Sequence, residues 1–507
     1  MPGRTVRLTG WGRVSPSSAE LASPGSAAAA AEVLARAAAR GAAAKVPSGV
    51  IPRGLGRSYN NAAQCGGGVV ISTARLNRIL DLDAATGLVT CEAGVSLEQL
   101  MVTGLPAGWF VPVSPGTRQV TVGGAIAADV HGKNHHVAGS FARHVRSFEI
   151  VLPGGQARTV TEQSDPALFW STAGGMGLTG LIVRATVQLK QVATSRVRVD
   201  TVRTADIDET MATLAEHDRG YGYTVAWSDS LARGAGLGRS VITSGDFAEP
   251  ADLPSADRQD PFAFRPGARL AVPPHFPPGL VNRYTVAGAN QAWYRKAPRS
   301  RRGELQAIGT FFHPLDGIRN WNRVYGPGGF RQYQYVVPSG QEAAVRRSFE
   351  LVSGARAPSF VTVLKRFGPG DDGLLSFPLA GWTLALDFPA RTPGLATLLG
   401  RLDRLVADVG GRVYLAKDSR VAPATFRAMY PRLDEWLAVR ERVDPNGVLR
   451  SDLGRRLGLC AVTDDGTNRG PRKKRASRTA ARRERTSPGR STSREGAAAT
   501  APPGGRS

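Results

Sequence analysis

Pro-Arg-Gly-Leu-Gly-Arg-Ser-Tyr-Asn-Asn-Ala-Ala, residues 52–63, is the stretch on which the interpretation of this chain depends. Gly54 and Gly56 remove side chains where a backbone must bend and approach a ligand. The serine hydroxyl and the N–H groups of the loop can donate to phosphate oxygens, and Arg53 and Arg57 add charge-assisted donors that suit a diphosphate. The segment predicts a pyrophosphate-binding loop, although Gly-Arg-Ser sequences are also common in turns, so on this segment alone an ordinary turn is an equal alternative.

Two further segments follow in the same region of the chain. Residues 115–124 are Pro-Gly-Thr-Arg-Gln-Val-Thr-Val-Gly-Gly, and residues 131–136 are His-Gly-Lys-Asn-His-His. In their order and their amino-acid sequences, the three segments resemble the FAD-linked oxidases of the vanillyl-alcohol oxidase type. Within that superfamily the chain is most similar to the decaprenylphosphoryl-β-D-ribose 2′-oxidase family, from about Gly10 to about Leu459. Further runs that carry this resemblance are residues 117–129, 139–141, 168–170, 177–180, 293–296, 313–316, 332–334, 416–420 and 429–432.

The resemblance implies an α+β fold of two domains, a PCMH-type FAD-binding domain and a substrate domain built on an antiparallel sheet. The FAD-binding domain would comprise residues 5–194 and 412–460, with the substrate domain at 195–411 and a disordered basic tail at 463–507. The implied reaction is FAD-dependent oxidation of the ribose 2′-hydroxyl of decaprenylphosphoryl-β-D-ribose to the 2′-keto sugar. This is the first step of epimerisation to the arabinose donor for cell-wall arabinan, and a reductase of the short-chain dehydrogenase type would be the partner.

The resemblance also assigns the FAD contacts. They are Arg53, Gly54, Leu55, Gly56, Arg57, Ser58, Tyr59, Asn60, Asn61, Ala62, Gly116, Thr121, Val122, Gly123, Gly124, Ala128, Asp129, Val130, His131, Ile182 and Tyr414. Many relatives in the superfamily tether the flavin through a histidine in a Gly-His-Ser sequence, where this chain has Arg57. We therefore expect non-covalent FAD.

Lys417 is the leading catalytic candidate, and His131 is assigned to positioning or polarisation beside the flavin ring. A partly desolvated lysine could relay a proton, or it could bind the substrate phosphate or the flavin's polar edge as a cation. A solvated lysine paired with Asp418 is the structural alternative. The resemblance maps the substrate pocket onto Tyr59, Lys133, Phe312, Gln332, Gln334, Lys365 and Ala385.

Several positions depart from the family pattern. Asn60 replaces a glycine, and asparagine tolerates positive φ better than most residues. Phe312 replaces a tyrosine, which removes a hydroxyl from the pocket. Thr383 and Ala385 stand where the family often has asparagine and cysteine, and both changes bear on substrate preference.

Composition limits the other possibilities. A chain of 507 residues favours two domains. The formal charge of +24 is partly concentrated in residues 470–507, which contain 11 Lys and Arg against two Glu and no aromatic residue. That tail should be disordered. Without an obvious recognition helix or aromatic sheet, the charge favours anionic lipid head groups over nucleic acid as the main partner.

No apolar run reaches the roughly 18 residues of a membrane span. The first residues lack the pattern of a secretory leader, and the Ala-rich run 27–44 predicts an amphipathic surface helix. We therefore expect a location in the cell envelope, peripheral to the plasma membrane. Cys65, Cys91 and Cys460 have neither metal-ligand spacing nor the pattern of a disulfide framework, so no metal site is expected.

Turn and capping signals predict the early elements. Expected strands are residues 68–71, 79–83, 87–91, 148–152 and 156–161, and expected helices begin after Ser96 and Asp165. Residues 175–180 spell a dinucleotide fingerprint, but a helix precedes them and a strand follows, which is the reverse of the Rossmann order. A tight helix-to-strand connection is expected there instead.

The Pro- and Gly-rich residues 233–281 predict a long mobile excursion. Strands are expected at 305–312, 332–337, 360–365 and 382–388, and helices at 396–409 and 423–439. Two rival functions stay open at this point. One is a flavin oxidase of a soluble sugar or alditol, and the other is a flavin-free module that binds lipid or nucleic acid.

Overall fold

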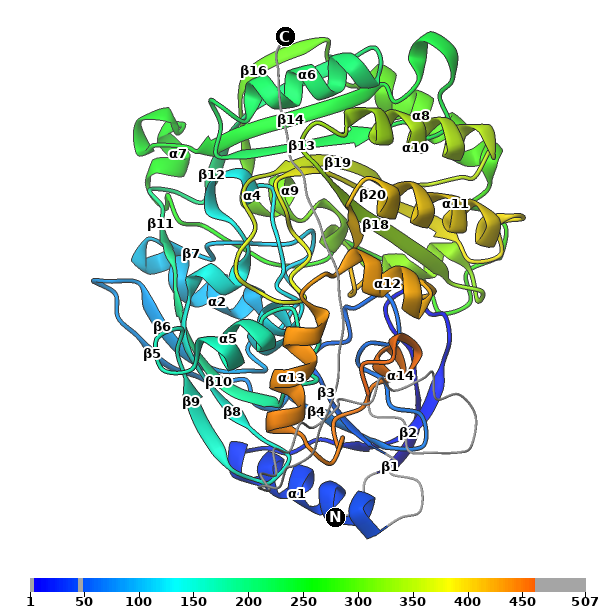
Figure 1. Cartoon of the computed structure of the whole chain (residues 1–507). Helices are drawn as coiled ribbons and strands as arrows, with labels where there is room; N and C mark the ends of the chain where they lie inside the picture. Colours follow the sequence, from blue (N-terminus) through cyan, green and yellow to red (C-terminus); the bar gives the residue numbers. More distant parts are fainter. Residues whose placement is uncertain (1–3, 44–48, 461–507) are drawn as a thin grey trace, which may run out of the picture. The chain divides into compact units, whose positions relative to one another are not determined.

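The computed structural model describes residues 4–43 and 49–460. Three main sheets organise this part of the chain (Figure 1). The four-stranded sheet has the order β1 (Arg4–Leu8), β2 (Ser17–Ala22), β4 (Val69–Ser72), β3 (Val50–Arg53). The five-stranded sheet has the order β5 (Ile79–Leu82), β6 (Leu88–Glu92), β10 (Leu181–Gln188), β8 (Val145–Val151), β9 (Ala157–Val160). The eight-stranded sheet has the order β16 (Ser300–Ala307), β12 (Arg196–Thr204), β14 (Ser240–Phe247), β13 (Tyr223–Ser228), β19 (Thr362–Phe367), β20 (Gly381–Pro389), β18 (Phe330–Pro338), β21 (Arg412–Val413).

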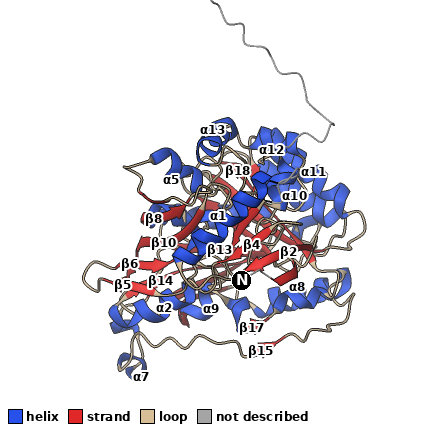
Figure 2. Cartoon of the chain, turned by 90° about the horizontal axis from the view of Figure 1, so that it is seen from below, coloured by secondary structure: helices blue, strands red, loops and turns tan. Residues whose placement is uncertain are grey.

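Two short pairs and the helices complete the described elements (Figure 2). The pairs are β7 (Trp109–Phe110) with β11 (Lys190–Gln191), and β15 (Leu270–Ala271) with β17 (Ile318–Arg319). The α-helices are α1 (Ala27–Ala43), α2 (Leu97–Gly104), α3 (Val122–Ala127), α4 (His135–Ala138), α5 (Pro166–Thr172), α6 (Ile207–His217), α7 (Ser255–Arg258), α8 (Arg283–Lys296), α9 (Ile308–Phe312), α10 (Glu342–Gly354), α11 (Leu395–Asp408), α12 (Pro423–Met429), α13 (Leu433–Val443) and α14 (Asp452–Leu457).

The first two sheets form the N-terminal part of the fold. α1 buries Ala30 and Leu34 in an apolar cluster that also contains strand residues from both sheets. A second cluster lies between the five-stranded sheet and α2, α3 and α5. The β5–β6 and β8–β9 hairpins are antiparallel, as their turn signals predict.

The eight-stranded sheet is antiparallel throughout and presents two chemically different faces. Tyr333 and Leu384 point into the core that α6, α10 and α11 cover. The neighbouring residues of the same strands, including Gln332, Gln334 and Ala385, line a cavity on the opposite face. Because side chains alternate along a strand, this two-residue period separates the core from the site.

The final segment returns from the eight-stranded sheet to the first two sheets. On α13, Trp436 Nε1 donates to the Ser171 carbonyl at 2.9 Å. Farther along, the Asp452 carboxylate accepts from Ser17 Oγ at 2.7 Å and from the Gly66 N–H at 2.8 Å. This return brings the segment that contains Lys417 against the glycine loop.

Local signals determine several helix ends. Ser96 and Gln99 form the predicted capping box at the start of α2, and Asp165 accepts from the Leu168 N–H at the start of α5. Residues 175–180 connect α5 to β10 and are therefore a helix-to-strand turn, as predicted.

Three predictions of secondary structure are wrong in part. Within the predicted excursion 233–281, residues 240–247 form β14, which pairs with both β12 and β13. The predicted strand 305–312 ends at Ala307 and becomes α9. The predicted helix 423–439 is two helices, because Pro431 lacks the N–H that a continuous helix requires.

The sequence also made predictions about the cysteines, the basic tail and membrane-spanning segments. All three cysteines are buried. The predicted disordered tail, 463–507, lies outside the described residues. Within 4–43 and 49–460, no helix has the length and apolarity needed to cross a bilayer.

Candidate active site

A cavity of about 1240 Å³ lies between the glycine loop, the segment 114–133, the polar face of the eight-stranded sheet and residues 414–417. These four parts are far apart in the sequence. The cavity exceeds the roughly 300–1,000 Å³ typical of a small-molecule pocket. It has room for a dinucleotide cofactor and part of a substrate.

The glycine loop presents bare backbone to this cavity. Residues 54–58 line it, and their five consecutive N–H groups donate to no other group in the described part of the chain. Gly56 has φ +67°, and a side chain there would approach the Arg53 guanidinium to 2.3 Å. Consecutive free N–H groups form a concave anion site of the kind that binds phosphates.

The side chains of the two arginines in the loop mainly contact other parts of the protein. Arg53 donates to the carbonyls of Ala63 and Thr9 at 3.1 and 2.8 Å. The Arg57 guanidinium lies 4.1 Å from the centre of the Trp11 ring. Both side chains therefore brace the loop, and the backbone supplies most of the donors that remain for a diphosphate.

Asn60 joins the glycine loop to the segment that contains Lys417. Its side-chain amide donates to the carbonyls of Leu415, at 2.6 Å, and Asp418, and its side-chain oxygen accepts from the Ala62 N–H. The Tyr59 N–H donates to the Ala416 carbonyl at 2.9 Å. A glycine at position 60 would make none of the side-chain contacts, so the substitution noted above adds a structural link.

A second link holds the segment 114–118 to the loop after α9. Ser114 Oγ lies 2.6 Å from His313 Nε2. Asp316 accepts from Thr117 Oγ1 at 2.8 Å and from the Arg118 N–H at 2.9 Å. These contacts close one side of the cavity.

Lys417 lies at the cavity wall, with its Nζ 5.2 Å from the centre of the Tyr59 ring. Its neighbour Asp418 is bound instead to Arg456, at 2.6 Å, which excludes the alternative of a Lys417–Asp418 surface pair. Burial lowers the pKa of Lys417, and the Asp387 carboxylate opposes that shift.

Asp387 is a buried acid that the sequence did not indicate. It lies on β20 opposite Gln332 on β18, and the Gln332 amide donates to its carboxylate. Burial raises the pKa of Asp387, while the Gln332 hydrogen bond and the Lys417 charge lower it. Its other carboxylate oxygen has no hydrogen-bond partner among the described residues, and Lys417 is the cation whose charge lowers its pKa.

A hydrogen-bonded chain sets the state of His131. The Thr383 hydroxyl donates to the Tyr335 carbonyl at 2.8 Å, so its oxygen accepts from the Gln334 amide at 3.0 Å. The same amide nitrogen lies 3.0 Å from His131 Nε2, which must then be the acceptor. The His131 proton is therefore on Nδ1.

His131 is neutral as well as oriented. Burial, with smaller contributions from Lys365 and Lys417, holds its pKa well below the ordinary 6.5. Its ring packs against Phe367 and Tyr414, with centroids 4.9 and 5.1 Å away. These contacts suit a positioning role better than proton transfer.

Two more lysines line the cavity. Lys133 donates to the Phe311 carbonyl, and Lys365 donates to the Gly132 carbonyl at 3.2 Å. Burial lowers the pKa of each to about 7, and for Lys365 the charges of Lys417 and Lys133 add to the effect. Among the described residues of the cavity wall, these two lysines favour an anionic ligand.

Most of the predicted site residues meet at this one cavity. Lys417, His131, every predicted substrate residue and most predicted cofactor residues line it. Those that lie behind the wall are Asn60, Asn61, Val122 and Asp129. Asn60, Val122 and Asp129 are buried, and Asp129 accepts from the Ala142 N–H and the Ser376 hydroxyl.

Sequence reasoning missed Asp387 and the role of Thr383. A signal was present, because residues 383, 385 and 387 alternate on one strand and must share a face. Ala385 was assigned to the pocket, so the same period places Thr383 and Asp387 beside it.

The residues present fit FAD. The unpaired N–H groups of the glycine loop suit its diphosphate. At Gly116, an added side chain would meet no protein atom within 4 Å, so the backbone there is open to the cavity. When bound, FAD supplies the acceptor for a hydride.

Two family models match parts of this chain. A family model described as FAD binding domain matches residues 19–161, and one described as D-arabinono-1,4-lactone oxidase matches residues 389–457. Together with the fold and the cavity, these matches define an FAD-dependent oxidoreductase of the FAD-linked oxidase type.

Similarity to individual proteins is more specific. Decaprenylphosphoryl-beta-D-ribose oxidase of Mycolicibacterium smegmatis is 46% identical over 460 residues, which cover 90% of this chain and 98% of that enzyme. L-gulono-1,4-lactone dehydrogenase of Mycobacterium tuberculosis is 26% identical over 433 residues, covering 84% of this chain and 93% of the relative. The chain belongs to the decaprenylphosphoryl-beta-D-ribose oxidase family. The predicted family, fold class and FAD cofactor are thus confirmed.

We predict that acid precipitation releases all of the flavin into the supernatant. Position 57 is an arginine, which cannot form the histidyl bond of the tethered relatives, and Arg57 is engaged with Trp11. The absorbance of the supernatant and the pellet at flavin wavelengths measures the outcome. Yellow colour that stays with the precipitated protein would contradict the prediction and direct attention to His131, the histidine of the described cavity wall.

Proposed function

We propose that this chain oxidises the ribose 2′-hydroxyl of decaprenylphosphoryl-β-D-ribose to the 2′-keto sugar, with FAD as the hydride acceptor. The observation that carries the proposal is the group of three cavity lysines, Lys133, Lys365 and Lys417, beside the amides of Gln332 and Gln334. Cations suit a phosphate and amides suit sugar hydroxyls, so the wall matches a sugar phosphate. Membership of the family supports the same substrate.

The cavity also continues into an apolar region. Its wall includes Phe311, Trp227, Trp293 and Phe360 in addition to the polar residues. Such a surface suits the first part of a prenyl chain attached to the phosphate.

The proposed roles follow from these contacts. Lys133 and Lys365 bind the phosphate. Gln332 and Gln334 orient the ribose. His131, which is neutral and held by Gln334, positions the part of the cavity wall that lies beside the flavin ring. Lys417 either accepts the 2′-hydroxyl proton as a neutral amine or stabilises negative charge as a cation, and its pH dependence distinguishes the two.

We further propose that a separate reductase of the short-chain dehydrogenase type returns the keto sugar to an epimeric alcohol. Oxidation at C2′ removes the stereocentre, so a second hydride transfer is needed to complete an epimerisation. The lipid substrate supports a location at the cell envelope, peripheral to the plasma membrane.

A second candidate is oxidation of a soluble sugar lactone. The match of residues 389–457 to the D-arabinono-1,4-lactone oxidase model supports this alternative. It makes no use of the three lysines, because a lactone carries no phosphate.

Anaerobic flavin reduction tests the proposal. We expect polyprenyl-phosphoryl ribose in detergent to bleach the flavin band, whereas D-arabinono-1,4-lactone and L-gulono-1,4-lactone leave it unchanged. Identification of the 2′-keto product by mass spectrometry after borodeuteride reduction completes the assignment. Bleaching by a lactone with no response to the lipid-linked ribose would overturn it.

We predict that binding of the phosphate-bearing substrate takes up protons near pH 8. Lys133 and Lys365 have pKa values lowered to about 7, so both are mainly neutral at about pH 8 in the free enzyme. A nearby phosphate favours the charged ammonium and raises both pKa values. The number of protons bound should therefore increase on binding.

Calorimetric titrations of the holoenzyme with a 2-deoxyribose analogue of the substrate, which carries the phosphate but has no 2′-hydroxyl to oxidise, measure that uptake in buffers of different ionisation enthalpy. It should vanish near pH 5.5, where both lysines are already charged, and should diminish in Lys365→Met. The exposed lysine variant Lys296→Met serves as the matched control and should retain it. A binding heat at about pH 8 that is independent of the buffer would argue against these roles.

A further inference from the structure

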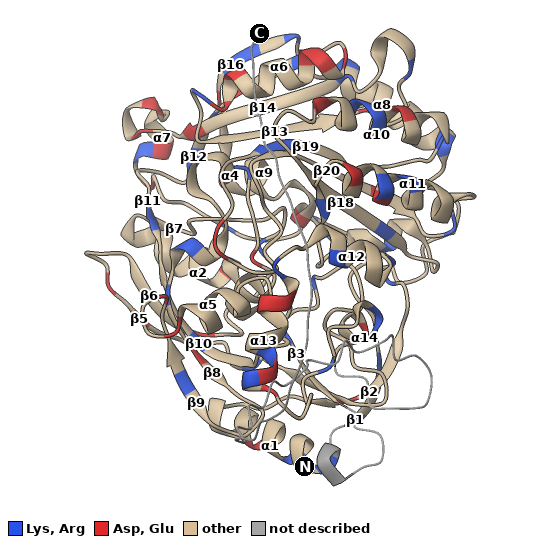
Figure 3. Cartoon of the chain, viewed as in Figure 1, with Lys and Arg blue, Asp and Glu red and all other residues tan. Residues whose placement is uncertain are grey.

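Residues 261–303, here called the basic segment, form a surface of unusual charge. They contain eight Lys and Arg residues and no Asp or Glu, although 41 acidic residues in 507 would predict about three in this length. The segment includes β15, α8 and the start of β16, and it runs along one edge of the described chain in Figure 2. The cations on α8 and β16 are blue in Figure 3.

The charges of the basic segment are largely uncompensated. All eight cationic side chains, Arg265, Arg269, Arg283, Arg295, Lys296, Arg299, Arg301 and Arg302, are exposed. Among the described residues, only Arg301 of these eight forms an ion pair, with Glu304. Elsewhere the exposed arginines of the fold frequently pair, as Arg432 does with Glu435.

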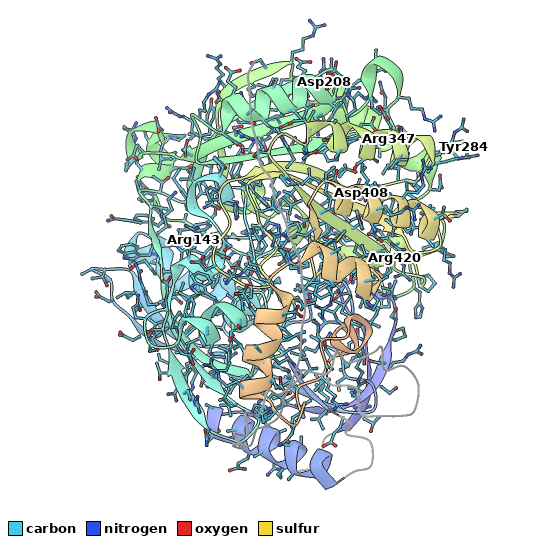
Figure 4. The ribbon with its side chains drawn as sticks, viewed as in Figure 1. Arg143, Asp208, Tyr284, Arg347, Asp408 and Arg420 are labelled. Atoms are coloured by element: carbon cyan, nitrogen blue, oxygen red, sulfur yellow. The ribbon has the colours of Figure 1, made fainter. Side chains whose placement is uncertain are left out.

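Large apolar side chains are exposed on the same segment. Leu270, Leu280, Tyr284 and Trp293 are 66%, 49%, 72% and 54% exposed, and they are half of the eight such side chains in the described chain. Figure 4 shows Tyr284 pointing away from the neighbouring strands. α8 buries only Val286 and Asn290. One face of the helix contacts the protein through Asn290, Gln291 and Tyr294, and most of its other residues are exposed.

The basic segment also forms the mouth of the cavity. Residues 266–268, Ala289 and Trp293 belong to the cavity wall, and most of them are exposed. Phe360, from the loop before β19, lines the same opening and is 39% exposed. The surface with unpaired cations and exposed aromatic side chains is therefore continuous with the entrance to the site.

We propose that the basic segment docks the enzyme on an anionic lipid bilayer, with the mouth of the cavity facing the membrane. The cations would bind lipid phosphates, and Tyr284, Trp293 and the leucines would enter the head-group region, where amphipathic aromatic residues are favoured. This inference rests on the proposed function in one respect. A polyprenyl chain remains in the bilayer, so a mouth at the membrane admits the sugar phosphate without extracting the lipid.

Vesicle co-sedimentation of the full-length holoenzyme tests the docking surface directly. We expect binding to phosphatidylglycerol–phosphatidylcholine vesicles that weakens with salt, and little binding to phosphatidylcholine alone. Combining Arg283→Ser, Arg295→Ser, Lys296→Ser and Arg299→Ser should weaken binding by about tenfold or more. Combining Leu270→Ser, Leu280→Ser and Tyr284→Ser should mainly reduce the binding that survives high salt.

The matched control combines Arg219→Ser, Arg391→Ser, Arg401→Ser and Arg404→Ser. These four arginines are exposed and unpaired in the described chain, and they lie outside the basic segment. The control changes the net charge equally and retains the basic tail, so it should weaken vesicle binding less than about twofold. Equal losses in the two sets would show that total charge alone governs binding and would overturn the proposal.

A second readout separates this inference from the proposed function. The four substitutions in the basic segment should slow flavin reduction by lipid-linked ribose in vesicles, but not by the same substrate in detergent. If no lipid-linked sugar reduces the flavin, the proposed substrate fails, while vesicle binding still tests the surface. If the basic-segment variant binds vesicles as the wild type does, the membrane proposal is wrong, and the surface belongs to a protein or nucleic-acid partner.

Discussion

Replacing Lys417 with alanine should lower the rate of flavin reduction by lipid-linked ribose by at least about 100-fold, the scale seen when one preorganised donor to developing charge is lost. Lys417 is the cation beside Tyr59 and the charge partner of Asp387, and a methyl side chain neither takes a proton nor stabilises an anion. Stopped-flow bleaching of the flavin under anaerobic conditions measures this step without interference from reoxidation.

Flavin content must be measured beside the rate, because Lys417 also lies next to the loop that Asn60 holds. Lys190→Ala is the matched control, since Lys190 also lies over a tyrosine ring, that of Tyr223, but is absent from the cavity wall. It should keep both flavin and rate. A Lys417→Ala protein that retains its flavin and reduces it at nearly the wild-type rate would remove Lys417 from the catalytic and the anchoring roles alike.

Replacing Asp387 with asparagine should move the kinetic pKa assigned to Lys417 toward lower pH by about one pH unit or more, as expected when an adjacent opposite charge is lost. The sign follows from the contacts. Asp387 favours the charged form of Lys417 and so raises the pKa of that lysine, while burial lowers it. Without the carboxylate, only the lowering effect remains.

The shape of the pH profile then assigns the role of Lys417. If the neutral amine accepts the hydroxyl proton, the rising acidic limb shifts to lower pH and the enzyme becomes more active there. If the cation stabilises charge, the falling alkaline limb shifts to lower pH and activity near neutrality decreases. Flavin reduction rates across the pH range give both limbs.

Asp403→Asn controls for the loss of a buried carboxylate. Asp403 is buried on α11 and pairs with Arg420, away from the cavity wall. This variant should leave the kinetic pKa unchanged. An unchanged profile in Asp387→Asn would mean that the two groups do not interact in the working enzyme.

Local signals were sufficient where a short stretch determines its own structure. Ser96 and Gln99 satisfy each other's backbone groups at the start of α2, and Asp165 with Pro166 starts α5, because capping depends on neighbours within one turn. The same reasoning failed at residues 240–247. β14 is a strand because β12 and β13 lie on either side of it, and the proline- and glycine-rich sequence around it hides that pairing.

The boundary between β16 and α9 is a second place where local sequence signals do not determine the structure. Residues 305–312 are apolar enough for either structure, and Phe311 and Phe312 are buried in the core of the five-stranded sheet when the chain turns into a helix after Ala307. A short apolar run does not distinguish the two forms by its period. Packing against distant residues decides between them.

The sequence by itself determined the family, the cofactor and the loop that presents backbone N–H groups to a diphosphate. Those properties depend on short stretches of sequence, such as the ones that contain Gly54, Gly56 and Gly116. The absence of a side chain at these positions follows directly from the residue type. Only the tertiary structure decided that Asp387 balances Lys417 and that Thr383 and Gln334 set the tautomer of His131. These groups come from separate strands and loops, and their charge and proton states depend on burial and on partners that exist only once the sheet has formed.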